Sequence, residues 1–186
     1  MAAALAPPSS TTVDIVSDQA IIVTGVSGSG KTTTGRLLAD RLKWTFADAD
    51  DFHPAGNVAK LAHGRPLDDA DRAPWLAALG DWLDEQHRAG HSVVLACSAL
   101  KRRYRDRLRH GRPQVRIVHL HGPDALIAQR LAHRTGHFMK AHMLEGQLSD
   151  LEAPAPDENV LTVDVDAPPD EIVSDIMSRL SLEPSA

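Results

Sequence analysis

The chain has 186 residues, of which 42% are hydrophobic and 24% are charged, and its formal net charge is −5 at pH 7. This length suits one α/β domain with its own core and is short for two. The negative balance argues against bulk attraction to nucleic acid or anionic lipid, and no apolar run approaches the roughly 20 residues of a membrane span. The single cysteine, Cys97, cannot form an internal disulfide, and we expect a buried thiol in a cytoplasmic protein.

The N-terminal segment, residues 1–18, is rich in Ala, Pro, Ser and Thr and contains no Lys or Arg. A secretory signal needs a positive start and an unbroken apolar stretch, which Pro7-Pro8 interrupts, and a mitochondrial transit peptide needs arginines. We therefore expect a disordered leader, followed by a single domain over residues 19–182.

A glycine-rich segment joins the first predicted strand, residues 20–23, to a predicted helix over residues 33–43. It reads GVSGSGKT over residues 25–32 and fits G-x-x-x-x-G-K-[ST], the phosphate loop of P-loop NTPases. Glycines let the backbone wrap around a pyrophosphate with its N–H groups pointing inward, and the helix N-terminus favours anions. Lys31 would reach the β- and γ-phosphates, and the Thr32 hydroxyl would ligate Mg²⁺. The predicted ATP site comprises Gly25, Ser27, Gly28, Ser29, Gly30, Lys31, Thr32 and Thr33.

The rest of the chain alternates between predicted strands and helices. Strands are expected at residues 44–47, 92–97, 115–120 and 159–163, and helices at 53–63, 71–90, 101–109, 123–133 and 169–180. Asp71 is the expected N-cap of the long second helix, with Pro74 in its first turn. This alternation predicts a parallel sheet with helices on both sides and ligands at the C-terminal ends of the strands.

The loop alone does not distinguish classes of NTPase, but other motifs do. The chain contains no N-K-x-D and no D-x-x-G, and the strand through Cys97 ends in Cys-Ser rather than in an Asp-Glu pair. These absences favour a small-molecule kinase. Such an enzyme needs a carboxylate near the acceptor hydroxyl and a mobile basic lid that excludes water.

Candidate carboxylates follow the second strand, at Asp48, Asp50 and Asp51. Asp48 and Asp50 are two residues apart and would share one face of an extended strand end. One could hold Mg²⁺ through water while the other orients and deprotonates an attacking hydroxyl. A simple strand-end turn is the alternative interpretation.

Basic residues supply the other parts of such a site. Arg130 and Arg134, four residues apart on a predicted helix, would contact phosphate, and residues 134–143 would form the lid, with Gly136 as a hinge. Lys101 and Arg105 lie one turn apart and could bind an anionic substrate.

Further motifs surround the acidic cluster and the central strand. They are DADDFHP at 48–54, Asn57, Lys60, Gly64, PLDD at 66–69, Asp71-Arg72, PWL at 74–76, CSALK at 97–101, YRD at 104–106 and GHF at 136–138. With these motifs the chain, from about residue 20 to about residue 180, resembles the bacterial gluconate kinases, which are related to shikimate kinase. The resemblance implies a three-layer P-loop NTPase fold of the nucleoside-monophosphate-kinase type, with a central parallel sheet and a mobile lid. It also implies ATP- and Mg²⁺-dependent phosphorylation of the 6-hydroxyl of D-gluconate by a homodimer.

The resemblance further implies roles for individual residues. Asp50 would be the acceptor-side carboxylate and Asp48 the metal-side one, although the extra acid Asp51 leaves open which acid acts as base. Arg105 or Lys101 would hold the gluconate carboxylate. The pocket would comprise Asp50, His53, Lys60, Arg72, Lys101, Arg105 and His137. Arg130 would lie along the adenine, Arg134 near the transferring phosphate, and the loop 166–168 with Pro168 beside the adenine.

Two other functions stay open. One is phosphorylation of another small hydroxy acid such as shikimate, although no glycine triplet follows the Cys97 strand. The other is an ATP-binding regulatory protein that contacts nucleic acid through the basic helix at 101–109, where only Tyr104 offers a stacking surface. Zinc at His119 and His121 is not expected, because no third ligand lies at a suitable spacing.

Overall fold

The structure of the protein is a computed structural model that describes residues 19–132 and 138–184, without the side chains of residues 138–143. The predicted leader, residues 1–18, therefore lies outside the described residues, as do Arg134, Gly136 and His137 of the predicted lid. The assignments made for these residues stay predictions.

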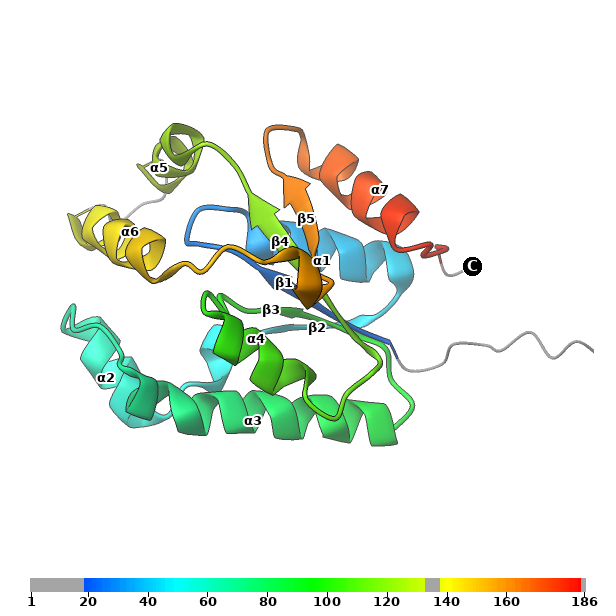
Figure 1. Ribbon diagram of the computed structural model, residues 1–186, viewed down its shortest axis with the longest axis horizontal. Helices are drawn as coiled ribbons and strands as arrows, with labels where there is room; N and C mark the ends of the chain where they lie inside the picture. Colours follow the sequence, from blue (N-terminus) through cyan, green and yellow to red (C-terminus); the bar gives the residue numbers. More distant parts are fainter. Residues whose placement is uncertain (1–18, 133–137, 185–186) are drawn as a thin grey trace, which may run out of the picture.

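Five parallel strands form one sheet in the order β2-β3-β1-β4-β5 (Figure 1). They are β1 (Ala20–Thr24), β2 (Thr45–Asp48), β3 (Val93–Ala96), β4 (Val115–His121) and β5 (Leu161–Asp164). Val23 of β1 and Asp48 of β2 are both in register with Ala96 of β3, so these strands end together. The predicted α/β fold with a central parallel sheet is confirmed, and the phosphate loop and the acidic cluster start from the same edge.

One face of the sheet is covered by α3 (Asp69–Arg88) and α4 (Arg102–Arg109), as Figure 1 shows. Alternate residues of β1, Ala20 and Ile22, pack in one buried cluster with Trp75 and Leu79 of α3 and Leu108 of α4. The side-chain period of two in a strand puts these residues on the same face.

The opposite face is covered by α1 (Lys31–Leu42) and α7 (Pro169–Arg179). The other residues of β1, Ile21 and Val23, pack there with Leu38 of α1 and Ile176 of α7. Both faces of β1 are thus buried, which explains why its sequence is continuously apolar rather than alternating.

The remaining elements are η1 (Ala49–Phe52) and α2 (Ala55–Ala62), which follow β2, α5 (Asp124–Ala132) and α6 (Phe138–Asp150), which follow β4, and η2 (Pro156–Glu158), which precedes β5. A third apolar cluster contains Val26 of the phosphate loop, Ile127 and Leu131 of α5, and Leu144 of α6. Helix α6 was not predicted, and it begins inside the segment assigned to the lid. The described part of the chain contains no helix with the length and apolarity that crossing a membrane would require.

Three predicted helix starts were wrong by two or more residues, and the first is α2, which begins at Ala55 rather than at residue 53. Helix α1 begins at Lys31, which places the end of the glycine-rich motif inside its first turn. Helix α3 is capped by Asp68, and Asp71 is the third helical residue of a capping box. Asp68 Oδ1 accepts from Asp71 N at 2.8 Å, and Asp71 Oδ2 accepts from Asp68 N at 3.1 Å. Either aspartate satisfies the sequence rule, and only the backbone of Asp68 is extended, as an N-cap requires.

Candidate active site

The glycine-rich segment has the backbone of a phosphate-binding loop. Gly25 and Gly28 have φ angles of 142° and 86°, in the region that disfavours side chains. A Cβ atom at Gly25 would lie 2.7 Å from the Leu120 carbonyl oxygen, and one at Gly28 would lie 2.9 Å from the Ile127 carbonyl oxygen. Both positions therefore need glycine for conformation and for close packing. The loop leads directly into α1, so the positive end of the helix dipole faces the site.

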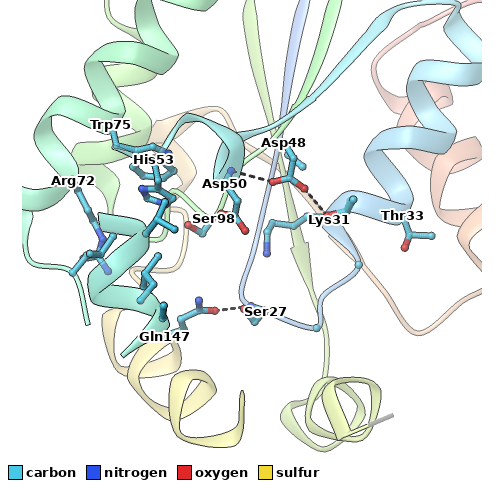
Figure 2. Close-up of a pocket in the computed structure, with 18 of the residues that line it drawn as sticks. Ser27, Lys31, Thr33, Asp48, Asp50, His53, Arg72, Trp75, Ser98 and Gln147 are labelled. Carbon is cyan, nitrogen blue, oxygen red and sulfur yellow. Dashed lines mark hydrogen bonds between the residues drawn. The ribbon is translucent and has the colours of Figure 1, made fainter. Parts of the chain in front are cut away.

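The Thr32 hydroxyl donates a hydrogen bond of 2.9 Å to Asp48 Oδ2. Asp48 Oδ1 in turn accepts from the Asp50 backbone N–H at 3.2 Å. The pair joins the first turn of α1 to the end of β2 (Figure 2). Among the described residues no group of three or more His, Cys, Asp or Glu could hold a metal ion. One hydroxyl and one carboxylate nevertheless fit Mg²⁺, which keeps several waters and takes further oxygens from phosphates.

Asp50 is the first acid of η1 and lines the same cavity as Lys31 and Asp48. Its side chain is open to the cavity, but the surrounding walls remove part of its hydration. This desolvation, together with the negative charge of Asp48, raises the pKa of Asp50, while Lys31 and His53 oppose the shift. A carboxyl with a raised pKa is a stronger base once it is ionised.

His53 stacks on Trp75 with ring centroids 4.7 Å apart and an angle of 12° between the planes. Burial is the largest cause of the lowered pKa of His53, and Asp50 acts against it. The Trp75 indole Nε1 donates to the Ala49 carbonyl oxygen at 2.7 Å, which fixes η1 against α3. Trp75 was predicted as a core residue, and it is buried, but it also forms part of the cavity wall.

These residues surround one cavity of about 600 Å³ (Figure 2). Its lining brings together the following predicted site residues: Ser27, Gly28, Gly30, Lys31, Thr32, Thr33, Asp48, Asp50, His53, Arg72 and Arg130. Gly25 and Ser29, also predicted at the ATP site, are buried and do not line this cavity, and a Cβ atom at Gly25 would meet Ser29 Oγ at 2.6 Å.

Two predicted substrate ligands, Arg72 and Lys101, contact the same carboxylate of α6, and only Arg72 of the two lines the cavity. Arg72 lines the cavity, and its Nη2 lies 3.7 Å from Asp150 Oδ2 of α6. Lys101 Nζ lies 3.2 Å from the other oxygen of the same carboxylate. Lys60, another predicted ligand, instead bonds Asp71 Oδ1 at 2.5 Å.

Arg105, a predicted substrate ligand, does not line the cavity. It is 2% exposed, and its Nε and Nη2 donate to the two carboxylate oxygens of Glu158 at 2.7 and 2.8 Å. Its remaining nitrogen donates to the Leu100 carbonyl at 2.9 Å. The guanidinium is thus occupied on both edges and buried, so its expected role as a clamp for a substrate carboxylate is corrected to a structural one.

Of the residues predicted beside the adenine, Arg130 lines the cavity and Pro168 does not. Arg130 lines the cavity, and its Nη2 donates to the Val165 carbonyl oxygen at 2.8 Å. Val165 begins the loop that leads to Pro168, the residue before α7. Arg130 therefore connects the cavity to the loop that was expected beside the adenine.

Several cavity residues were not predicted. Ser98 follows β3, Gln147 comes from α6, and an apolar group comes from α2 and the loop after it: Val58, Leu61, Ala62 and Leu67. The motif CSALK carried a signal for Ser98, and the apolar positions of α2 recur at helical spacing. No sequence pattern pointed to Gln147, because the helix that carries it, α6, was not predicted.

Other potentially reactive or charged residues have structural roles. Cys97 is buried, as predicted, and burial raises the pKa of its thiol to about 12. His119 is buried beside the Thr24 hydroxyl at 3.2 Å, and desolvation lowers its pKa to about 4. On the basic helix, Arg102 pairs with Asp157 at 2.8 Å and Arg103 with Asp69 at 2.5 Å. These pairs reduce the charge that this helix could offer to nucleic acid.

Comparison with known proteins agrees with this geometry. A family model described as "AAA domain" matches residues 21–154. A curated gluconokinase of Gluconobacter oxydans is 47% identical over 163 residues, which cover 88% of this chain and 92% of that protein. The crystal structure of a gluconokinase from Sinorhizobium meliloti has 43% identity and a TM-score of 0.78, over 88% of this chain and 92% of that one. A shikimate kinase from Aquifex aeolicus, with 18% identity and a TM-score of 0.55, shares the fold.

The identity extends over most of both chains, and the structure places the phosphate loop and the acidic residues Asp48 and Asp50 in one cavity. The chain belongs to the gluconokinase family of P-loop kinases.

Proposed function

We propose that the protein transfers the γ-phosphate of ATP to the 6-hydroxyl of D-gluconate. The observation that carries this proposal is the position of Asp50, which shares one cavity with the phosphate loop and with a cationic end at Arg72. An acceptor hydroxyl beside Asp50 would face a phosphate beside Lys31. Phosphoryl transfer of this kind depends mainly on positioning and on charge neutralisation.

The donor side would be formed by the loop and by α1. Lys31 Nζ donates to the Val26 carbonyl oxygen at 3.0 Å, and we infer that it moves to the β- and γ-phosphates when ATP binds. Thr32 and Asp48 would hold Mg²⁺, directly or through water. When bound, Mg²⁺ neutralises charge on the phosphate oxygens. Arg130 and the loop ending at Pro168 would border the adenine, and Arg134 would contact the transferring phosphate.

The acceptor side would be organised by Asp50. Its carboxylate would accept the proton of the attacking hydroxyl as the bond to phosphorus forms. The raised pKa of Asp50 suits this role, because a weakly basic carboxylate would take the proton less readily. His53, held by its stack on Trp75, would form the adjacent wall against which the polyol chain lies.

The substrate carboxylate would bind at Arg72 and Lys101. Both already contact a carboxylate, that of Asp150, at 3.7 and 3.2 Å. A cationic pair favours an aldonic acid over a neutral sugar, because only the acid brings a further carboxylate to the two cations that Asp150 contacts. Lys60 and His137 stay predicted ligands, and the homodimer and the cytoplasmic location stay predictions as well.

A coupled assay of ADP release tests the proposal. The purified protein with ATP and Mg²⁺ is offered D-gluconate, D-glucose or shikimate in parallel. We expect turnover with gluconate and no more than background with the other two. Turnover with shikimate and not with gluconate would contradict the proposal and support the alternative hydroxy-acid substrate.

A further inference from the structure

One face of α6 connects the two halves of the site. Gln147 Oε1 accepts a hydrogen bond of 2.6 Å from the backbone N–H of Ser27 in the phosphate loop (Figure 2). Three residues further on, Asp150 contacts Lys101 and Arg72 at 3.2 and 3.7 Å. Residues three apart lie on the same helix face. A single helix thus contacts both the nucleotide loop and the expected site of the substrate carboxylate.

The partner of Gln147 is a functional group of the loop. In a phosphate loop the backbone N–H groups are the donors that bind phosphate oxygens. Ser27 and Gln147 both line the cavity, so a phosphate bound there would lie near the hydrogen bond between them. A neutral amide oxygen is a weaker acceptor than a charged phosphate oxygen. A phosphate reaching this N–H would therefore displace Gln147.

Packing keeps Gln147 close to the loop after such a displacement. Leu144, one turn earlier on α6, is buried in the same apolar cluster as Val26, the residue before Ser27. Gln147 also lines both the main cavity and a smaller one of about 40 Å³, which contains Arg72, Ser98 and Asp150. The side chain therefore stands between the donor and acceptor ends.

We propose that Gln147 is a further catalytic residue for phosphoryl transfer, whose amide contacts the transferring phosphate, an inference that rests on the proposed kinase function. Without nucleotide its amide oxygen occupies the Ser27 N–H. When a triphosphate takes over that N–H, the carboxamide turns its NH₂ group toward the transferring phosphate. Because Gln147 and Asp150 lie on the same helix, the release of Gln147 from the loop would also change the contact of Asp150 with Arg72 and Lys101.

The test uses Gln147→Ala, Gln147→Glu and the control Ser149→Ala, an exposed position on the same helix. Calorimetry without acceptor gives the Kd values for AMP, ADP and a non-hydrolysable ATP analogue, and steady-state assays give kcat and KM. For Gln147→Ala we expect kcat to fall by about tenfold to a hundredfold, as for a lost bond to a charged group. The Kd for the ATP analogue should stay the same or decrease, because the competing oxygen is gone.

For Gln147→Glu the prediction is a charge effect. The added carboxylate should raise the Kd for the ATP analogue by about tenfold or more while the Kd for AMP changes little. A purely structural role would instead weaken all three nucleotides alike and lower Tm. That pattern, or a kcat of Gln147→Ala within about twofold of the wild type, would overturn the proposal. If the wild type failed to phosphorylate gluconate, the proposed function would fail, while the selective effect of Gln147→Glu on the ATP analogue would still test the contact with the loop.

Discussion

The Thr32 hydroxyl and the Asp48 carboxylate, 2.9 Å apart, join the first turn of the phosphate-loop helix to the end of the neighbouring strand β2. Strands β2 and β1 are not adjacent, because β3 lies between them. The contact therefore crosses the C-terminal edge of the sheet and brings together the two residues that we propose as metal ligands, both of which line the cavity.

Asp48→Asn should weaken the binding of Mg²⁺ to which this pair would contribute. We expect the Mg²⁺ concentration for half-maximal activity to rise by about tenfold or more, with KM for gluconate nearly unchanged, because the amide removes one negative charge next to the ion. A magnesium titration at saturating ATP measures this. The exposed Asp175→Asn serves as the control, and a variant Asp48→Asn with unchanged magnesium requirement would contradict the assignment.

Asp50→Asn should separate catalysis from stability. We expect kcat to fall by about a hundredfold or more, because the amide cannot accept the proton of the hydroxyl. The Kd for ATP should change little, and Tm should rise, because the substitution removes a partly desolvated charge beside Asp48. Stopped assays and thermal unfolding measure these quantities. An unchanged kcat would mean that another acid, such as Asp51, is the base.

The pH dependence follows from the direction of the Asp50 shift. Its pKa is raised in the folded protein, so the ionised, active base is lost at a higher pH than for an ordinary aspartate. We expect kcat/KM to fall as the pH is lowered through this raised pKa, and the acidic limb to disappear in the residual activity of Asp50→Asn. If the acidic limb were the same in the wild type and in Asp50→Asn, a group other than Asp50 would be responsible for it.

Arg105 and Glu158 should matter for folding rather than for substrate binding. Their side chains are each 2% exposed, and removing one partner leaves an unpaired buried charge. Glu158→Gln should lower the free energy of unfolding by about 3–5 kcal/mol, against about 0–1 kcal/mol for the exposed control Asp175→Asn. Denaturant titration at neutral pH measures both.

The same pair gives a stability prediction for acid. Arg105 holds the pKa of Glu158 below its usual range, so the stabilisation is full above the ordinary glutamate pKa. It is lost as the pH falls through the lowered, folded-state pKa. The difference in stability between wild type and Glu158→Gln should therefore shrink in acid, and a difference that is independent of pH would contradict the pairing.

Arg72 and Lys101 should determine the affinity for the anionic substrate. Replacing either residue by Met should raise KM for gluconate by about tenfold or more, with KM for ATP within about twofold, because each supplies a charged contact to the carboxylate. The exposed Arg179→Gln is the matched loss of charge. Equal effects on both KM values would indicate that these residues support the cavity rather than the substrate.

Local sequence patterns predicted most of the donor side of the site. The glycine-rich loop, the apolar strand before it and the helix after it are continuous over residues 20–42, so the sequence alone predicts roles for Lys31 and Thr32. The spacing of Asp48 and Asp50 likewise predicted two carboxylates at one strand end, and both line the cavity.

The error at Arg105 came from a partner distant in sequence. Helical spacing puts Arg105 and Lys101 on one face, but only the fold places Glu158, 53 residues away, against Arg105. Lys101 and Arg105 therefore have different roles despite lying one turn apart. Gln147 was missed because α6 contains Gly146 and no clear apolar stripe, so its sequence does not reveal a helix that reaches the phosphate loop.

The most direct test of the account is to identify the product by phosphorus NMR for the wild type and for Lys31→Ala. The account predicts, for the wild type, one phosphate ester at carbon 6 of gluconate for each ADP formed. Lys31→Ala should remain folded but form this ester slower by orders of magnitude, because the charge beside the transferring phosphate is gone. ADP formation without a gluconate ester, or near-normal turnover in Lys31→Ala, would contradict it.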